Sequence, residues 1–163
     1  MTQQLSSVLL GLVILAWIGW RQLRVRPVKE RSLLPLLIVA YGLWQIVQFA
    51  GRHAIPAGDW LVLAGSAVLG LGLALWRAFT VRLWAGANGA MVRGTWLTVA
   101  LWALGLVQHL GSEPFLHSDG LGPTSLVAYL GLVLLLQREL VLIRADRAGL
   151  VPHTRGERAD ALR

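Results

Sequence analysis

The chain has no cysteine. This absence excludes structural disulfides, thiolate metal sites, iron–sulfur clusters and direct thiol–disulfide chemistry, whichever compartment the loops face. The haem attachment motif and the His-Glu-x-x-His zinc motif are missing as well. The sequence therefore carries no recognisable signature of a redox enzyme or a metalloenzyme.

Charged side chains are also scarce, at 14% of the residues, and lysine occurs once, as Lys29. The chain is instead 56% hydrophobic, with a mean hydropathy of +0.62. Its 163 residues fit one domain by length, but the composition is far too apolar for a soluble domain of that size. We therefore predict an integral membrane protein.

Apolar runs of about 17 to 20 residues, the length that a helix needs to cross a bilayer, occur five times. The first run follows an uncharged segment and precedes Arg21 and Arg24, so it predicts an uncleaved span and not a signal peptide. The expected fold is an all-α bundle of five transmembrane helices in a domain at 1–145, with a polar, disordered cytoplasmic tail at 146–163. The expected spans are 5–20, 33–50, 60–76, 95–111 and 124–143.

The basic residues predict the orientation, because lysine and arginine near span ends stay on the cytoplasmic side. Thirteen of the fifteen fall on one side of the expected spans, Arg52 falls on the other, and Arg138 lies inside the last span. This split predicts a multi-pass protein of the cell membrane, with its N-terminus outside and its C-terminus in the cytoplasm. Since the basic residues lie in loops and form no single face, nucleic acid is not an expected partner. The thirteen are Arg21, Arg24, Arg26, Lys29, Arg31, Arg77, Arg82, Arg93, Arg144, Arg147, Arg155, Arg158 and Arg163.

Small side chains recur every four residues in the third expected span, at Ser66, Gly70 and Ala74. Helices in lipid associate through close backbone approach, which small residues permit. The stripe predicts that this helix packs at the centre of the bundle. A seam between two copies of the chain is the alternative.

The segment between the third and fourth expected spans has an extended pattern, with Trp84 on one side of a turn signal and Arg93 on the other. Asn88-Gly89 is a typical tight-turn pair. We predict a short cytoplasmic hairpin or extended turn that places Arg82 and Arg93 near anionic lipid headgroups. Contact with a soluble partner is the alternative.

The chain contains several short motifs, which are Arg26-Pro27-Val28-Lys29, Leu33-Leu34-Pro35, Trp76 to Arg82, Trp84, Asn88-Gly89, Arg93-Gly94-Thr95 and Arg138. Together they resemble the CcdC-like family of small bacterial integral membrane proteins, which is named after a gene found beside cytochrome c maturation genes and has no known function. Similar proteins tend to have Asp-Gly at the turn, where this chain has Asn88-Gly89; the exchange keeps the turn chemistry and removes a carboxylate. The resemblance implies a membrane-embedded protein and argues against a catalytic acid at the turn.

Ionisable groups inside spans are costly and are candidates for function. Arg138 and Glu139 lie near the cytoplasmic end of the last expected span, where a long side chain can reach the interface. We interpret them as residues that snorkel to the interface or form a structural pair with a neighbouring helix, with a transport or sensing role as the alternative.

Three histidines gather on the predicted outer side, at His53, His109 and His117, with Glu113 and Asp119 nearby. Imidazoles near carboxylates can ligate zinc or copper, and two facing histidines can hold a haem iron. Isolated histidines at helix ends more often bond to carbonyl groups or water. No cofactor is therefore predicted, and a haem or metal site stays the alternative.

His117-Ser118-Asp119 contains the residue types of a hydrolytic triad, but a triad needs groups that converge from different elements. We predict no enzymatic activity. The expected function is that of an accessory, assembly or sensing component of the membrane, with a haem- or metal-binding protein as the alternative. Anionic lipid and other membrane proteins are the expected partners.

Overall fold

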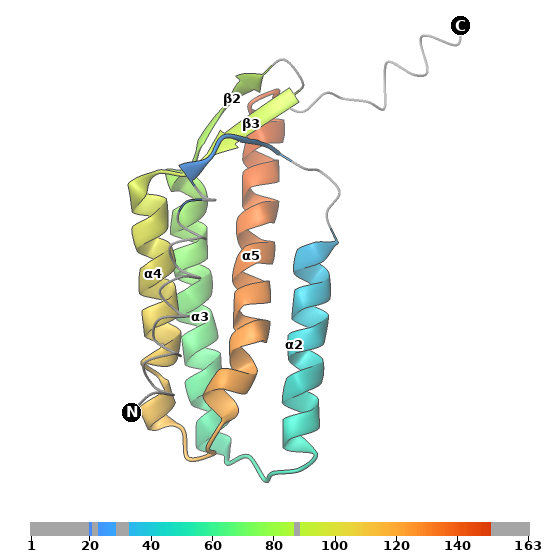
Figure 1. Ribbon diagram of the computed structural model, residues 1–163, viewed down its shortest axis with the longest axis vertical. Coiled ribbons are helices and arrows are strands. Elements are labelled where there is room, and N and C mark those ends of the chain that lie inside the picture. The colour runs from blue at the N-terminus through green and yellow to red at the C-terminus, as the bar shows by residue number, and fades with distance from the viewer. Residues whose placement is uncertain (1–19, 21–22, 29–32, 87–88, 151–163) are drawn as a thin grey trace, which may run out of the picture.

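The computed structural model describes residues 20, 23–28, 33–86 and 89–150. Four α-helices lie side by side in it, and a small sheet covers one end of them (Figure 1). The helices are α2 (Leu34–Ala50), α3 (Ala57–Thr80), α4 (Trp96–Leu110) and α5 (Leu121–Arg147), with the 3-10 helix η1 (Glu113–Phe115) before α5. The strands are β1 (Arg26–Pro27), β2 (Arg82–Gly86) and β3 (Gly89–Arg93).

Local signals in the sequence set the helix starts. Pro35 lies in the first turn of α2 and Pro56 precedes α3, where the missing N–H of proline costs no helical hydrogen bond. Thr95 and Thr98 form a reciprocal capping box at the start of α4. Gly120 precedes α5 with φ of +84°, a conformation that glycine adopts without strain.

The prediction of a five-helix transmembrane bundle is wrong. The described residues form four α-helices, of which only α3 and α5 are long and apolar enough to cross a membrane, by length and composition. α2 and α4 have 17 and 15 residues. At 1.5 Å per residue they reach about 26 and 23 Å, less than the roughly 30 Å of a hydrocarbon core. All of the expected first span but Trp20 lies outside the described residues.

The two long helices extend beyond the expected spans at both ends. α3 covers 57–80 where 60–76 was expected, and α5 covers 121–147 where 124–143 was expected. Arg77 and Arg144 are therefore helical residues and not loop residues, because hydropathy marks the end of an apolar run and not the end of a helix. The first two residues of the expected tail, 146 and 147, belong to α5, residues 148–150 follow the helix, and 151–163 lie outside the described residues.

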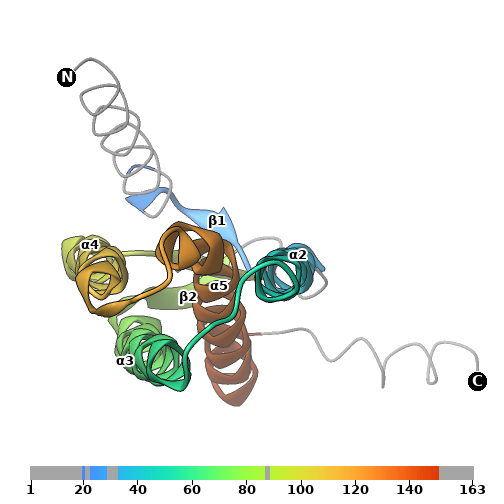
Figure 2. The same cartoon turned by 90° about the horizontal axis from the view of Figure 1, so that it is seen from below.

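The central helix is α5, and the expectation that α3 takes this place is wrong. Seen along the helices, α5 lies between α2 on one side and α3 with α4 on the other (Figure 2). Glycines allow the close contact between α2 and α5: Gly42 lies against the backbone of Ala128, and Gly131 lies against Val39. The sequence pattern did not reveal this seam.

The small-residue stripe of α3 does pack inside the protein, as predicted. Ser66, Gly70 and Ala74 are all buried, and Gly70 lies directly against the ring of Tyr129 on α5. The neighbouring Gly65 and Gly72 face open space. The stripe therefore joins α3 to its neighbours in the same chain.

The predicted hairpin between α3 and α4 is confirmed by the antiparallel pairing of β2 with β3. Its turn lies one residue earlier than expected, because Gly86 pairs with Gly89 and Gly89 already belongs to β3. Gly89 has φ of +106°, whereas Asn88 lies outside the described residues. A third strand that was not predicted, β1, pairs with β3 and gives the sheet the order β1-β3-β2.

One face of this sheet packs on the ends of α3 and α5. Val92 of β3 joins Ala78, Val81 and Val141 in a buried cluster. Side chains alternate between the two faces of a strand, so Trp84 and its partner Met91 lie on the opposite, outer face. One face of the sheet thus packs on the helices, and the opposite face points away from them.

Candidate functional site

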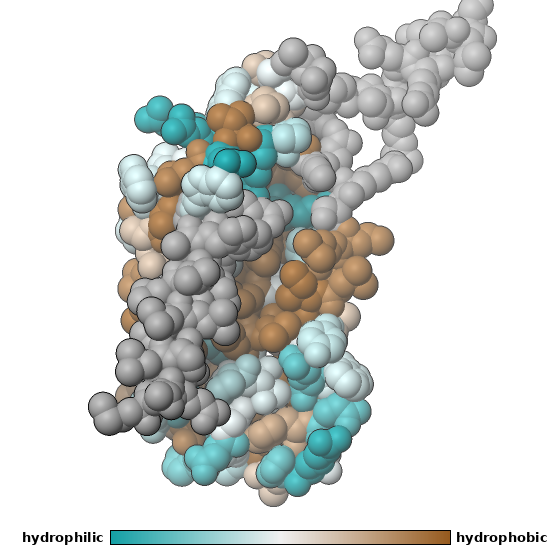
Figure 3. All heavy atoms as spheres, viewed as in Figure 1, coloured by the Kyte–Doolittle hydropathy of each residue, from teal (hydrophilic) through white to brown (hydrophobic). Residues whose placement is uncertain are grey.

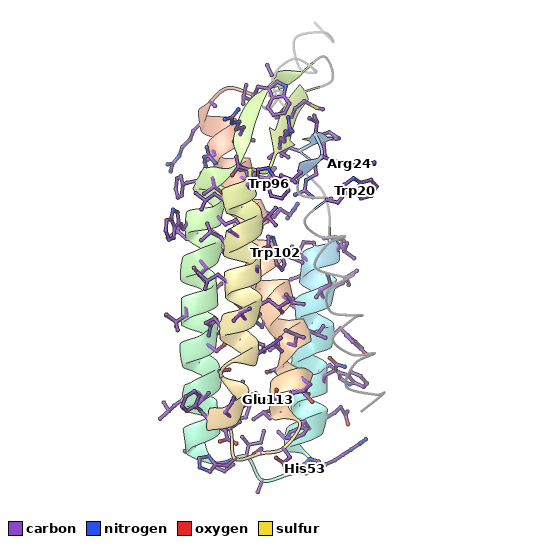
Figure 4. The ribbon with its side chains drawn as sticks, turned by 60° about the vertical axis from the view of Figure 1, so that its left-hand side comes forward. Trp20, Arg24, His53, Trp96, Trp102 and Glu113 are labelled. Atoms are coloured by element: carbon purple, nitrogen blue, oxygen red, sulfur yellow. The ribbon has the colours of Figure 1, made fainter. Side chains whose placement is uncertain are left out.

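The three predicted outer histidines make different contacts and form no shared site. His53 is exposed and stacks on Phe49, whose carbonyl oxygen it approaches within 3.3 Å. His109 is only 3% exposed and lies inside the helical bundle, and His117 contacts Asp59. Within the described ranges no three histidine or acidic side chains come close enough to hold a metal ion. Figure 4 shows His53 and Glu113 at the end of the molecule far from the sheet.

Asp59 fastens the loop before α5 to the start of α3. It is fully buried, and its two carboxylate oxygens accept hydrogen bonds from the backbone N–H groups of His117 at 3.0 Å and Ser118 at 2.9 Å. The Nδ1 atom of His117 lies 3.1 Å from the same carboxylate, although the His117 side chain is 78% exposed. A negative charge in the first turn of a helix is favoured by the helix dipole. The His-Ser-Asp run therefore supplies donors to an acid elsewhere in the chain.

Asp59→Ala is expected to lower the melting temperature more than Asp59→Asn, because alanine removes every acceptor and the amide keeps one oxygen. The measurement is thermal unfolding of the purified protein in detergent, followed by tryptophan fluorescence. Asp119→Asn, in an exposed residue of the same loop, is the matched control and should leave the melting temperature unchanged. Equal melting of Asp59→Ala and the parent protein would rule out this anchor.

His109 lies at the centre of a chain of hydrogen bonds that joins α3, α4 and α5. Ser125 donates to the carbonyl of Gly122 at 2.9 Å, so its oxygen is left to accept from Nε2 of His109 at 3.4 Å. Gln108 donates to Ser66 at 3.0 Å, and the hydroxyl of Ser66 lies 2.9 Å from Nδ1 of His109, to which it can donate. These contacts fit a neutral ring that carries its proton on Nε2, with Ser66 donating to Nδ1 and Ser125 accepting from Nε2.

A serine within hydrogen-bonding distance of histidine is also the first pair of a hydrolytic site. Here Ser66 and Ser125 are as buried as the ring, and Ser125 occupies the place where a triad has an acid. The ring of Tyr129 stacks on the imidazole of His109, with 4.3 Å between the two ring centroids. The arrangement joins α3, α4 and α5 through buried hydrogen bonds.

A buried arginine, Arg77, lies nearer the sheet and was not singled out by the sequence. It is 1% exposed, and its guanidinium carbon lies 4.3 Å from the ring centroid of Trp102, which Figure 4 labels among the helices. Among the residues that the structure describes, Nε and Nη2 of Arg77 and Nε1 of Trp102 find no hydrogen-bond acceptor. A cation stacked on an indole is stabilised by the ring, but its N–H groups still require acceptors.

At the sheet end, Arg82 and Trp84 are exposed residues of β2. Arg93 of β3 lies directly across from Arg82 and donates through Nε to the carbonyl oxygen of Leu23 at 3.0 Å. The structure thus brings the two predicted hairpin arginines together on one face.

Arg138 and Glu139 form an ion pair with each other, with 2.5 Å between Nη1 and Oε1. Both are partly exposed residues of α5. This ion pair lies within one helix.

Comparison of the chain with protein-family models, curated proteins and solved structures gives no match. The resemblance to the CcdC-like family therefore stays a prediction from the sequence motifs.

Proposed function

We propose that the chain is a multi-pass protein of the bacterial cell membrane that acts as a non-enzymatic accessory subunit. Its sheet lies on the cytoplasmic side and contacts a second membrane protein. The observation that carries this proposal is a sheet with an exposed aromatic and basic face, fixed at one end of an apolar helical body.

The apolar body supports the membrane location. Two of its helices are long enough to cross, and Figure 3 shows hydrophobic residues across the middle of one face, with hydrophilic residues toward its two ends. Large side chains such as Leu37, Val68 and Val107 are each more than 60% exposed on different helices. Apolar surface on several helices at once is unfavourable in water and favourable against lipid.

The position of the arginines supports the orientation. Arg82, Arg93 and Arg147 are exposed at the sheet end, and Arg52 is exposed in the loop between α2 and α3. Basic residues are retained preferentially on the cytoplasmic side. The sheet and the end of α5 are therefore assigned to the cytoplasm.

The outer face of the sheet supports the contact with a partner. Arg82 lies opposite Arg93 there, and Trp84 lies opposite Met91. Like charges directly across a strand pair destabilise a sheet, whereas exposed tryptophan, methionine and arginine are typical of protein interfaces. An acidic surface on the partner would relieve the repulsion between the two arginines.

Labelling of introduced cysteines tests the orientation, because the chain has none of its own. A membrane-impermeant maleimide applied to intact cells is expected to label Asp119→Cys and to leave Ala85→Cys unlabelled until the membrane is opened. Both residues are exposed. Recovery of the protein in the soluble fraction, or labelling of Ala85→Cys in intact cells, contradicts the proposed location or orientation.

Site-specific photocrosslinking tests the contact with a partner. A photoreactive amino acid at Met91, on the outer face of the sheet, is expected to give a discrete protein adduct in native membranes at normal expression. The matched control is the same group at Leu104, an exposed apolar residue of α4. Absence of a protein adduct at Met91, or the same adducts at both positions, counts against an accessory role through the sheet.

A further inference from the structure

An open groove of about 720 Å³ lies beside the sheet, between strand β2 and the last turns of α5. Its basic residues are Arg82, Arg144 and Arg147, and no acidic side chain of the described residues lines it. Apolar side chains complete its walls. The apolar members are Val81, Leu83, Trp84, Ala148 and Leu150.

The three arginines differ in how firmly they are held. Arg144 donates through Nη1 to the carbonyl oxygens of Ala78 and Val81 at the end of α3, so its guanidinium is fixed at the groove. Arg82 and Arg147 are exposed and form no ion pair with any residue in the described ranges. One fixed cation and two available ones therefore face the same space.

Apolar residues continue from this groove toward the helical body. Phe79 is exposed in the last turn of α3, and the guanidinium carbon of Arg144 lies 5.4 Å from its ring centroid. Ile143 is exposed on α5 four residues before Arg147, and so lies on the same side of that helix, one turn closer to its middle. A ligand that contacts both the arginines and these apolar residues has an anionic head and an apolar tail.

We propose that this groove binds one anionic phospholipid, with the headgroup phosphate among Arg82, Arg144 and Arg147 and the acyl chains along Phe79 and Ile143. Guanidinium groups suit phosphate because their N–H groups form paired hydrogen bonds to its oxygens. This inference rests on the membrane location proposed above. It adds a defined lipid site to the general attraction of basic loops to a charged membrane surface.

Native mass spectrometry of the full chain in a neutral detergent tests the site with dioctanoyl phosphatidylglycerol and dioctanoyl phosphatidylcholine as probes. We expect preferential binding of the anionic lipid. Arg82→Gln and Arg147→Gln should each weaken that binding about fivefold, and the double variant about 25-fold, which corresponds to ~1 kcal/mol per basic residue near a membrane surface. Arg144 is left unchanged because it caps α3.

The control variant is Arg24→Gln/Arg52→Gln, which loses the same charge outside the groove. It should keep the preference for phosphatidylglycerol, and circular dichroism should show that all variants retain their helical content. Equal binding of the two lipids, or equal losses in the two double variants, overturns the proposal. Competition by inorganic phosphate as effective as that by the lipid also overturns it, because the occupant would then be a free phosphate.

The outcome is separable from that of the proposed function. If the protein is found in the membrane and crosslinks through Met91 but binds both lipids equally, only the proposed lipid site is contradicted. If the protein is found in the soluble fraction, the proposed membrane location is contradicted, whatever lipids the protein binds in detergent.

Discussion

Gly42→Ala and Gly131→Ala are expected to destabilise the protein, whereas Gly65→Ala and Gly72→Ala are expected to leave it as stable or more stable. All four substitutions add one methyl group within a helix. A Cβ atom at position 42 would overlap the backbone nitrogen and Cα of Ala128, and one at position 131 would lie 2.7 Å from the backbone nitrogen of Val39. Backbone atoms cannot avoid the new methyl group by changing rotamer as a side chain can, so α2 must move away from α5.

Two opposing effects determine the sign. Alanine is favoured over glycine in a helix by about 1 kcal/mol, and this gain applies to all four variants. Overpacking of a closed contact costs about 1–3 kcal/mol, and only positions 42 and 131 have such a contact. The net expectation is a loss of up to ~2 kcal/mol at positions 42 and 131 and a small gain at positions 65 and 72.

Thermal unfolding in detergent measures these differences. A change of 1 kcal/mol corresponds to a shift of about 2–4 °C in melting temperature for a chain of this size. The double variant Gly42→Ala/Gly131→Ala should fall below either single variant, and a cysteine pair across α2 and α5 should crosslink less readily in it. A stabilised Gly42→Ala would mean that the two helices are not in backbone contact at this position.

The seam between α2 and α5 shows where sequence reasoning failed for the fold. Ser66, Gly70 and Ala74 repeat at the helical period, and that repeat correctly predicted a packed face. Gly42 and Gly131 are isolated in their own helices and contact residues about 90 positions away, so no local pattern distinguishes them from the exposed Gly65. The hairpin was predictable because its signals are local, whereas the pairing of β1 with β3 joins distant segments.

The candidate sites divide in the same way. Arg82 and Trp84 were identified from the hairpin pattern, and the structure places both on the edge strand β2. Asp59 was missed although an acid soon after Pro56 is a recognised signal of a helix start. His109 was grouped with the outer histidines because hydropathy gives depth along a helix but not the direction in which a side chain points.

Arg77 was assigned to a cytoplasmic loop because it follows the last residue of an apolar run. Local pattern alone could not correct this, since Arg77 is buried only because α4 and α5 cover that side of α3. Its partner Trp102 comes from α4, 25 positions further along the chain. Such a contact is a property of the assembled helices.

Arg77→Met is expected to stabilise the isolated protein. Methionine has a similar length and an apolar side chain, so it can fill the space against Trp102 without placing a charge in the interior. Removal of an uncompensated buried charge is expected to gain about 1–3 kcal/mol after the lost stacking on Trp102 is deducted. Thermal unfolding in detergent should therefore show a melting temperature several degrees above that of the parent protein.

Two further variants make this expectation specific. Arg52→Met removes an exposed arginine and should change the free energy of unfolding by no more than about 0.5 kcal/mol. Arg77→Lys keeps the charge but replaces the planar group that lies over the indole, and should be less stable than the parent protein. The order Met above Arg above Lys separates the cost of the charge from the benefit of stacking.

A fall in the melting temperature of Arg77→Met contradicts this interpretation of Arg77. It would mean that the guanidinium has an acceptor which the described residues do not supply, and that removal of the charge breaks that interaction. The same variant in lipid nanodiscs then decides where the acceptor lies. A loss of stability that appears in lipid and is absent in detergent assigns the acceptor to the membrane, and a loss in both assigns it to the protein.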